Sequence, residues 1–364
     1  MSRDVSTDGN QAATSNTTPD GEQPDASLPV PPPNRGLRGR LDAAGVRRPV
    51  LVGSLLTATS AISYSLANVA LRQASRPDDF PWAVWITANK ALVAFTAALL
   101  ICLWHRSKGR AGFPPLAVVP QLLLAGFLTQ FVGNLSFQYA LALGGLALTV
   151  PLTFSTLIIT GAVGGRLVLG EPVTWRTLSA MAVMIVAVAT LSQAASTASA
   201  NRTGDVSTTA LAVMAGCLSG VGYGGVGVVI RKMRQAKLTV AASLVLIGAT
   251  GVFGVGMLAV AFNGPAIVWS VAEPSYVWIL LASVFNAVAF FAVAAAYGLL
   301  PVTRVNLINA SQAAIGGAAG VTIFGEPLTG FLIFGSLLTL GGLVITSLPA
   351  DRSRERSVSG LASE

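Results

Sequence analysis

Histidine and cysteine are scarce in this chain. Its 364 residues include one histidine, His105, and two cysteines, Cys102 and Cys217, each of which lies inside an apolar run. These numbers exclude a disulfide framework and provide no zinc-ligand spacing. Acidic residues are also absent from the apolar runs, so a catalytic set at membrane depth has no side chains to use. We therefore predict that the chain is not an enzyme and uses neither a metal nor a cofactor.

Charged residues are scarce as well. Only 10% of the residues are charged and 53% are hydrophobic, whereas about a quarter of the residues of a soluble protein are charged. The net charge of +8 comes from short basic groups between long apolar runs. A nucleic-acid-binding domain would instead gather its basic residues on one compact face, so we expect no nucleic-acid partner. Membrane proteins place basic residues between their spans, and we expect a lipid bilayer as the partner.

What the chain does have is a series of apolar runs, each near the ~20 residues that a helix needs to cross a bilayer. Each run must be helical, because hydrocarbon leaves backbone groups without water, and the alternating pattern of a transmembrane barrel is absent. The least secure division is the one at Gly144-Gly145. The ten predicted spans are 50–71, 81–104, 119–141, 145–167, 175–194, 208–230, 239–262, 276–298, 303–324 and 328–348.

Two polar tails flank the predicted spans. Residues 1–49 are rich in Ser, Thr, Asp, Pro and Gly, so we predict a disordered tail, and residues 349–364 form a second tail. The first apolar run starts too late for a signal peptide. With the N-terminus inside, Arg3 and eighteen further Lys and Arg residues lie in the inner segments, and only Arg72, Arg76 and Arg202 lie outside. This asymmetry predicts cytoplasmic termini and a multi-pass protein of the cell membrane, the inner membrane of a bacterium.

Two sequence echoes indicate an internal repeat. Gly170-Glu171-Pro172 follows the fourth span and Gly325-Glu326-Pro327 follows the ninth, 155 residues later. Ser60, Tyr64 and Arg72 have the spacing of Ser219, Tyr223 and Arg231, 159 residues later. We therefore predict two five-helix repeats, residues 50–195 and 208–348. Because five is odd, the second repeat must be inverted, an arrangement that recurs in secondary transporters.

The paired Gly-Glu-Pro segments resemble the EamA repeat of the drug/metabolite transporter superfamily. Tyr139-Ala140-Leu141 and Tyr297-Gly298-Leu299, which lead into the fourth and ninth spans, are similar to a further element of that repeat. The resemblance implies a ten-helix secondary transporter, since most members export amino acids, metabolites or drugs. The chain departs from the pattern at Asn306 and Asn309, where a proline like Pro151 is expected. A kink in the ninth span is therefore left open.

Lys90 is the sole charge well inside a predicted span. A lysine at the bilayer centre costs roughly 3 kcal/mol on insertion scales, so it should face a cavity or a partner. It could bind an anionic group such as a substrate carboxylate, or it could extend toward the membrane surface. It follows Pro81 by nine residues, about 13 Å along a helix, which is far for the second alternative.

Amides and tyrosines inside the spans are further candidates, because polar residues in an apolar helix either line a water-filled path or bond a neighbouring helix. We predict a substrate cavity from them, and no acid lies mid-span to serve as a proton relay. The candidates beside Lys90 are Tyr64, Asn68, Gln130, Asn134, Gln138, Tyr223, Asn306 and Asn309.

The motif residues themselves receive structural interpretations. Glu171 and Glu326 each precede a helix, and we expect each carboxylate to cap the helix that follows it. Residues 222–227 match G-x-G-x-x-G, but no strand precedes them, so we expect close helix packing instead of nucleotide binding.

The sequence thus predicts an all-helical, ten-span exporter of small organic solutes that works by alternating access. The alternative is a non-transporting membrane receptor or assembly protein. The sequence names neither the solute nor the coupling ion, and it leaves a homodimer open.

Overall fold

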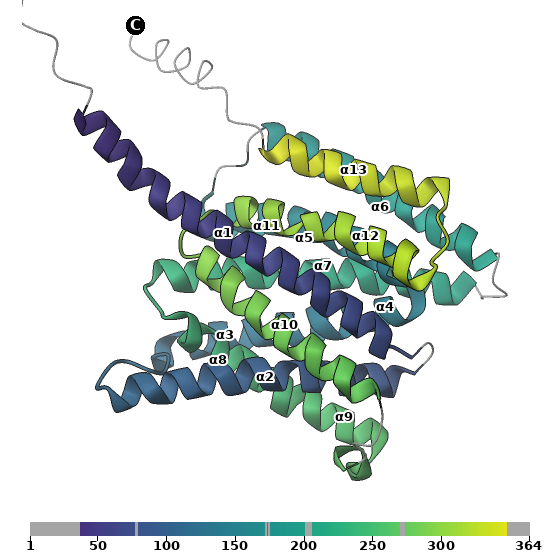
Figure 1. Ribbon diagram of the computed structural model, residues 1–364, viewed down its shortest axis with the longest axis horizontal. Coiled ribbons are helices and arrows are strands. Elements are labelled where there is room, and N and C mark those ends of the chain that lie inside the picture. The colour runs from purple at the N-terminus through teal and green to yellow at the C-terminus, as the bar shows by residue number, and fades with distance from the viewer. Residues whose placement is uncertain are drawn as a thin grey trace, which may run out of the picture. The chain divides into compact units, whose positions relative to one another are not determined.

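The structure is a computed structural model that describes residues 37–76, 79–171, 173, 175–200, 206–269 and 274–347. Every regular element in these ranges is a helix (Figure 1). Residues 1–36 of the predicted N-terminal tail, the predicted C-terminal tail 349–364, Pro172 and Arg202 lie outside the described residues. Helix α1 starts at Leu37, thirteen residues before the predicted boundary, because Leu, Arg and Ala at its start favour helix.

Within the described ranges, eight helices are long and apolar enough to cross a membrane, and two shorter apolar stretches, Leu178–Leu191 and Gly330–Gly342, lie within the predicted fifth and tenth spans. The prediction of an all-helical polytopic membrane protein is therefore confirmed. Short 3₁₀ turns cover Leu116–Val118 and Pro265–Val268. The helices are α1 Leu37–Ala74, α2 Phe80–Ser107, α3 Val119–Phe127, α4 Ser136–Gly144, α5 Leu146–Leu169, α6 Trp175–Ala200, α7 Val206–Gln235, α8 Val240–Ala249, α9 Gly256–Asn263, α10 Ser275–Ala296, α11 Val302–Asn309, α12 Ser311–Phe324 and α13 Gly330–Ser347.

Two spans contain π-helical turns. Segment η2, Leu128–Leu135, joins α3 to α4, and segment η3, Thr250–Val255, joins α8 to α9. Such turns have i→i+5 hydrogen bonds and occur often at functional sites. The extra residue in each turn rotates the side chains that follow, which matters for the site described below.

The uncertain boundaries are settled by backbone geometry. Gly145, with φ of 78°, ends α4 and precedes α5, which confirms the predicted division. The ninth span breaks between α11 and α12 at Ala310, whose ψ is −5° instead of the helical value. The break needs no proline, so the span is interrupted despite the asparagines at 306 and 309.

Glycines bring α7 against its neighbours, as the sequence predicted. A side chain on Gly222 would lie 2.5 Å from the backbone nitrogen of Gly133 in η2. A side chain on Gly224 would lie 2.7 Å from the carbonyl oxygen of Leu157 in α5. Backbone contact of this kind needs residues without side chains, so the segment 222–227 serves helix packing.

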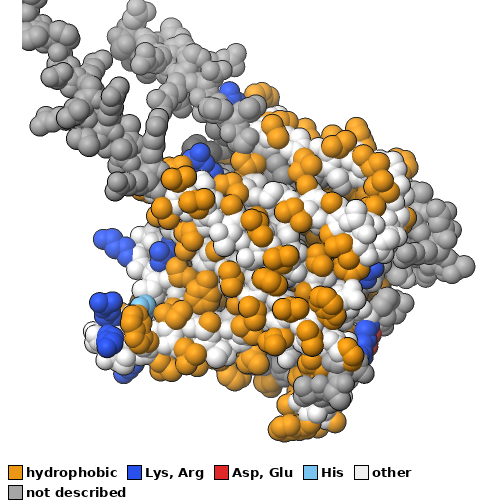
Figure 2. Space-filling view, in the orientation of Figure 1, with side chains coloured by type: hydrophobic (Ala, Val, Ile, Leu, Met, Phe, Trp, Pro, Cys, Tyr) orange, Lys and Arg blue, Asp and Glu red, His pale blue; other side chains and the backbone are white. Residues whose placement is uncertain are grey.

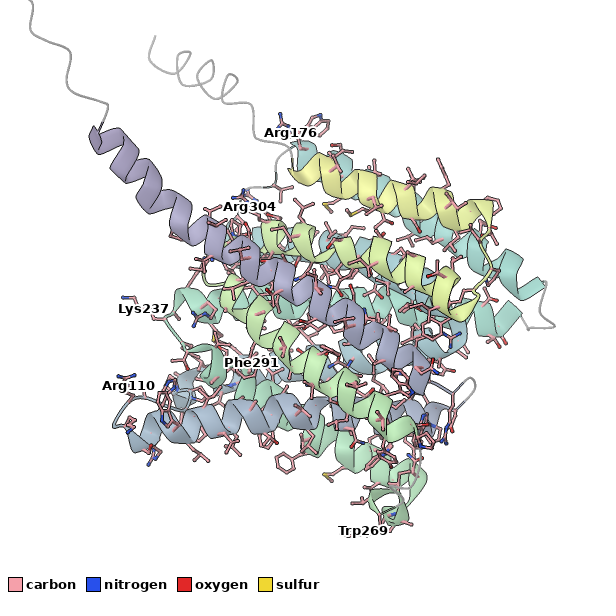
Figure 3. The ribbon with its side chains drawn as sticks, in the orientation of Figure 1. Arg110, Arg176, Lys237, Trp269, Phe291 and Arg304 are labelled. Carbon is pink, nitrogen blue, oxygen red and sulfur yellow. The ribbon has the colours of Figure 1, made fainter. Side chains whose placement is uncertain are left out.

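Hydrophobic side chains cover the face of the bundle between its two ends (Figure 2). Among the residues labelled in Figure 3, Arg110 and Lys237 lie at the left, Arg304 and Arg176 lie above them at the left-hand ends of α11 and α6, and Trp269 lies at the lower right. Basic residues that the charge count assigned to one side of the membrane are thus gathered at one end of the bundle.

Candidate functional site

A cavity lies among helices that are long and apolar enough to cross a membrane. Its volume open to the centres of water molecules is about 100 Å³. On the same measure, one water needs roughly 10–15 Å³, so the cavity holds several. Of the nine predicted cavity residues, all except Gln138 line it. Its polar lining is contributed by Tyr64, Asn68, Lys90, Thr129, Gln130, Asn134, Thr153, Tyr223, Asn286, Tyr297, Asn306, Asn309 and Gln312.

Lys90 is the centre of a hydrogen-bonded network on one wall. Its side chain is 2% exposed, and its Nζ donates to Asn134 Oδ1 over 2.7 Å. The Tyr223 hydroxyl donates to the same oxygen over 2.7 Å. Asn134 Nδ2 donates in turn to Gln130 Oε1 at 2.8 Å. The lysine therefore faces the cavity, and helices α2, α7 and segment η2 each supply one part of the network.

The π-helical segments orient this wall. Gln130 and Asn134 both lie in η2, and Gln130 Nε2 donates over 3.1 Å to the carbonyl oxygen of Ile247, shortly before η3. The amide row is thereby tied to the backbone of the seventh span. A chain of oriented amides holds the Asn134 oxygen toward Lys90 without any charged partner.

Gln138 is the predicted cavity residue that the structure places elsewhere. Its Nε2 donates to the Ser75 hydroxyl over 2.7 Å, and its Oε1 has no partner. The prediction assumed that Gln130, Asn134 and Gln138 share one face of a regular helix. Gln130 and Asn134 lie within the π-helical segment η2 and Gln138 follows it in α4, so Gln138 is turned by about one position, ~100°, relative to a regular helix.

A second group of polar lining residues comes from α11 and from the residues that follow α10 and α11. The Tyr297 hydroxyl donates to Asn306 Oδ1 over 2.8 Å, and Gln312 Nε2 donates to Asn309 Oδ1 over 3.2 Å. The Nδ2 of Asn306 is buried, and no described residue accepts a hydrogen bond from it. An unused amide donor of this kind is available for a water or a bound solute.

Several lining residues were not selected from the sequence. Asn286 is the clearest of them, since it is a single amide inside the apolar helix α10. Inspecting each isolated amide, besides the periodic ones, would have found it. The apolar part of the lining, which no periodicity identifies, includes Phe137, Phe154, Leu157, Phe290 and Val293.

Glu326 joins the start of α5 to the end of α1. Its two carboxylate oxygens accept from the backbone nitrogens of Leu146 and Ala147 at 2.8 and 2.7 Å, and Arg72 Nε donates to it over 3.0 Å. The expectation that it caps the following helix is therefore wrong. Thr329 caps α13 instead, by accepting from Leu332 N. Glu326 reaches across to the first turn of α5, where two free N–H groups and the helix dipole favour a carboxylate.

Glu171, its counterpart in the repeat, makes a looser contact. Arg231 Nε lies 3.7 Å from it, and Arg231 Nη1 donates to the carbonyl oxygen of Tyr297 over 2.7 Å. The Glu171 side chain is 19% exposed, whereas that of Glu326 is 7% exposed. Both carboxylates follow a glycine that ends a helix in the left-handed conformation, Gly170 at φ 67° and Gly325 at φ 60°. The two motifs thus share a backbone geometry and differ in how tightly their carboxylates are held.

Solved structures have the same fold. One, whose title reads only "Crystal structure of protein", matches with a TM-score of 0.54 and 15% identity, over 82% of this chain and 98% of that chain. At this identity the likeness shows the fold alone. No curated protein sequence matches the chain.

The family comparison concerns the first half of the chain. Residues 51–193 match the model of the EamA-like transporter family. This segment contains α2 to α5 and Lys90, and it ends within α6. The resemblance inferred from the Gly-Glu-Pro motif is thereby confirmed for residues 51–193, which are similar to that family.

Proposed function

We propose that the chain is a secondary transporter that exports small organic solutes by alternating access between two inverted five-helix repeats, residues 50–195 and 208–348. The observation that carries the proposal is the polar cavity at membrane depth. Both proposed repeats contribute to its lining, Lys90 and Asn134 from the first, Tyr223 and Asn309 from the second. Transporters of this design place their substrate site at the interface of the repeats, near the midplane.

The difference between the two carboxylate contacts supports alternating access. The cavity lining reaches Ile230, five residues before the end of α7, and Tyr297, which follows α10. Both lie toward the end that holds Glu171, where the carboxylate contact is loose. At the other end Glu326 is bonded to α5 and to Arg72. This arrangement favours access to the cavity from the Glu171 end. A conformation with a tight contact at Glu171 and a loose one at Glu326 would favour access from the Glu326 end.

Purified protein in liposomes should move solutes from a panel of amino acids, monocarboxylates and organic amines. Asn134→Leu should lower the rate for transported solutes by about tenfold or more, because Lys90 and Tyr223 lose their shared acceptor inside the cavity. Radiolabel uptake measures the effect. Asn89→Leu is the matched control, since the Asn89 amide bonds its own helix at Trp85 O and lines an outer groove instead. No flux of any solute above empty liposomes would contradict the proposal.

We also propose that the bundle lies in the bacterial inner membrane with both termini in the cytoplasm. Lys237 follows α7 at the left of Figure 3, and Trp269 follows the 3₁₀ turn after α9 at the lower right. In a background with Ser at positions 102 and 217, Lys237→Cys should react with an impermeant maleimide only after the cells are opened. Trp269→Cys, at a side chain that is 83% exposed, should react in intact cells. The reverse pattern would overturn this orientation.

A further inference from the structure

We propose that the cavity recognises monoanionic solutes with an apolar body, and that Lys90 binds their carboxylate or an equivalent oxyanion. This inference rests on the proposed transport function and deepens it, because it names the charge of the solute. It depends on three features: the unused hydrogen-bonding capacity of Lys90, the distribution of carboxylates, and the apolar side chains that face the same space.

Lys90 has hydrogen-bonding capacity that the protein does not use. An ammonium group has three N–H donors, and the described contacts of Nζ consist of one bond, to Asn134 Oδ1. That oxygen also accepts from Tyr223, so both of its lone pairs are occupied. Two donors therefore remain for an acceptor that enters the cavity, and a buried charge is stable only when such a partner completes its bonds.

The described carboxylates among residues 80–347 do not line the cavity that Lys90 faces. Within residues 80–347 the acidic residues are Glu171, Asp205, Glu273 and Glu326. Glu171 and Glu326 are engaged at opposite ends of the bundle, with Arg231 and with Arg72, and neither lines the cavity. A solute carboxylate at Lys90 would supply the missing negative charge, whereas the ammonium group of a solute would meet a like charge and no acid among the described lining residues.

The apolar part of the cavity lining suits an apolar body. Phe137 and Phe154 line the cavity together with Leu157, Phe290 and Val293. Burial of apolar surface favours binding by ~25 cal/mol per Å². Aromatic faces also attract cations, so the competing hypothesis is a cationic solute. Solutes that share one ring and differ in charge distinguish the two hypotheses.

Three phenyl compounds supply that series at neutral pH: 3-phenylpropanoate is an anion, L-phenylalanine a zwitterion and 2-phenylethylamine a cation. Equilibrium dialysis against the purified full chain should show the anion binding at least about tenfold more tightly than the amine, since a charge-assisted hydrogen bond changes affinity by this factor or more. Benzoate and hexanoate extend the carboxylate set to other sizes. Equal binding of anion and amine, or no binding of any carboxylate, would overturn the inference.

Lys90→Met retains most of the side-chain volume and removes the charge. It should weaken the binding of the best carboxylate at least about tenfold, while Asn89→Leu, the neighbouring control, leaves it unchanged. Unaltered binding by Lys90→Met would also overturn the inference.

The wild-type charge series tests the inference even if this variant fails to fold. Flux of phenylalanine or phenylethylamine that is insensitive to Lys90→Met would refute anion recognition and leave the proposed transport function intact, whereas no flux of any solute would count against transport itself.

Discussion

Glu326→Gln is expected to shift the conformational equilibrium by about a hundredfold toward the state in which the Glu326 end is open. The carboxylate holds two backbone N–H groups of α5 and the side chain of Arg72. A glutamine keeps one acceptor oxygen and turns an amide N–H₂ toward these donors. At least two charge-assisted bonds, each about 1.5–3 kcal/mol, are lost or weakened, and ~1.4 kcal/mol corresponds to a factor of ten.

Accessibility of one cavity cysteine measures the shift. Val226 lines the cavity, so Val226→Cys, with Ser at positions 102 and 217, can be labelled separately from each side of oriented vesicles. Glu326→Gln should raise labelling from the Glu326 side. Glu171→Gln should not, because Glu171 contributes only the loose contact to Arg231. Thr329→Val is the matched control, since it removes a cap from the same loop and leaves the Glu326 contacts in place. If Glu326→Gln leaves labelling from that side unchanged, the carboxylate does not hold this end closed.

The spans could be predicted from the sequence because hydropathy is a local property. Each helix that crosses a bilayer must satisfy its own backbone, so a run such as 145–167 determines α5 almost alone. Gly145 could be identified in advance for the same reason, since a positive φ is a local requirement that glycine meets.

Contacts between distant segments could not be predicted in this way. Glu326 accepts from Leu146, 180 residues away, and from Arg72, 254 residues away. The repeat located the carboxylate, but a helix follows Glu326 directly, and local reasoning assigned it to that helix. The backbone N–H of Leu332 in that helix donates to Thr329 Oγ1, and the carboxylate accepts from α5 instead.

The cavity was partly predictable. The rows of amides and the lone charge at Lys90 identified which helices face the interior, because such groups are costly in lipid. Gln138 was misplaced because periodicity was extended through η2, whose π-helical turns do not follow it. Asn286 was missed because a single amide has no period.

Substitution of single glycines in α7 should reveal how closely the proposed repeats must approach. Gly224→Ala is expected to destabilise the protein by about 1–3 kcal/mol, because the new Cβ would lie 2.7 Å from the carbonyl oxygen of Leu157 and α5 cannot yield without moving backbone. Gly222→Ala should be at least as severe, since its Cβ would meet the backbone of both Gly133 and Leu128. Melting of the purified protein in detergent measures each change.

Gly225→Ala is the matched control, one residue further along the same helix. Its Cβ would meet only Leu128 Cδ1, at 3.2 Å, which is the end of a flexible side chain. Alanine is favoured over glycine in a helix by up to ~1 kcal/mol, so this variant should melt at or above the wild-type temperature. Equal destabilisation by all three substitutions would show that α7 tolerates no added methyl for reasons unrelated to backbone contact. A loss confined to positions 222 and 224 would place the tightest approach where α7, from the second proposed repeat, crosses η2 and α5 from the first, beside the cavity that both repeats enclose.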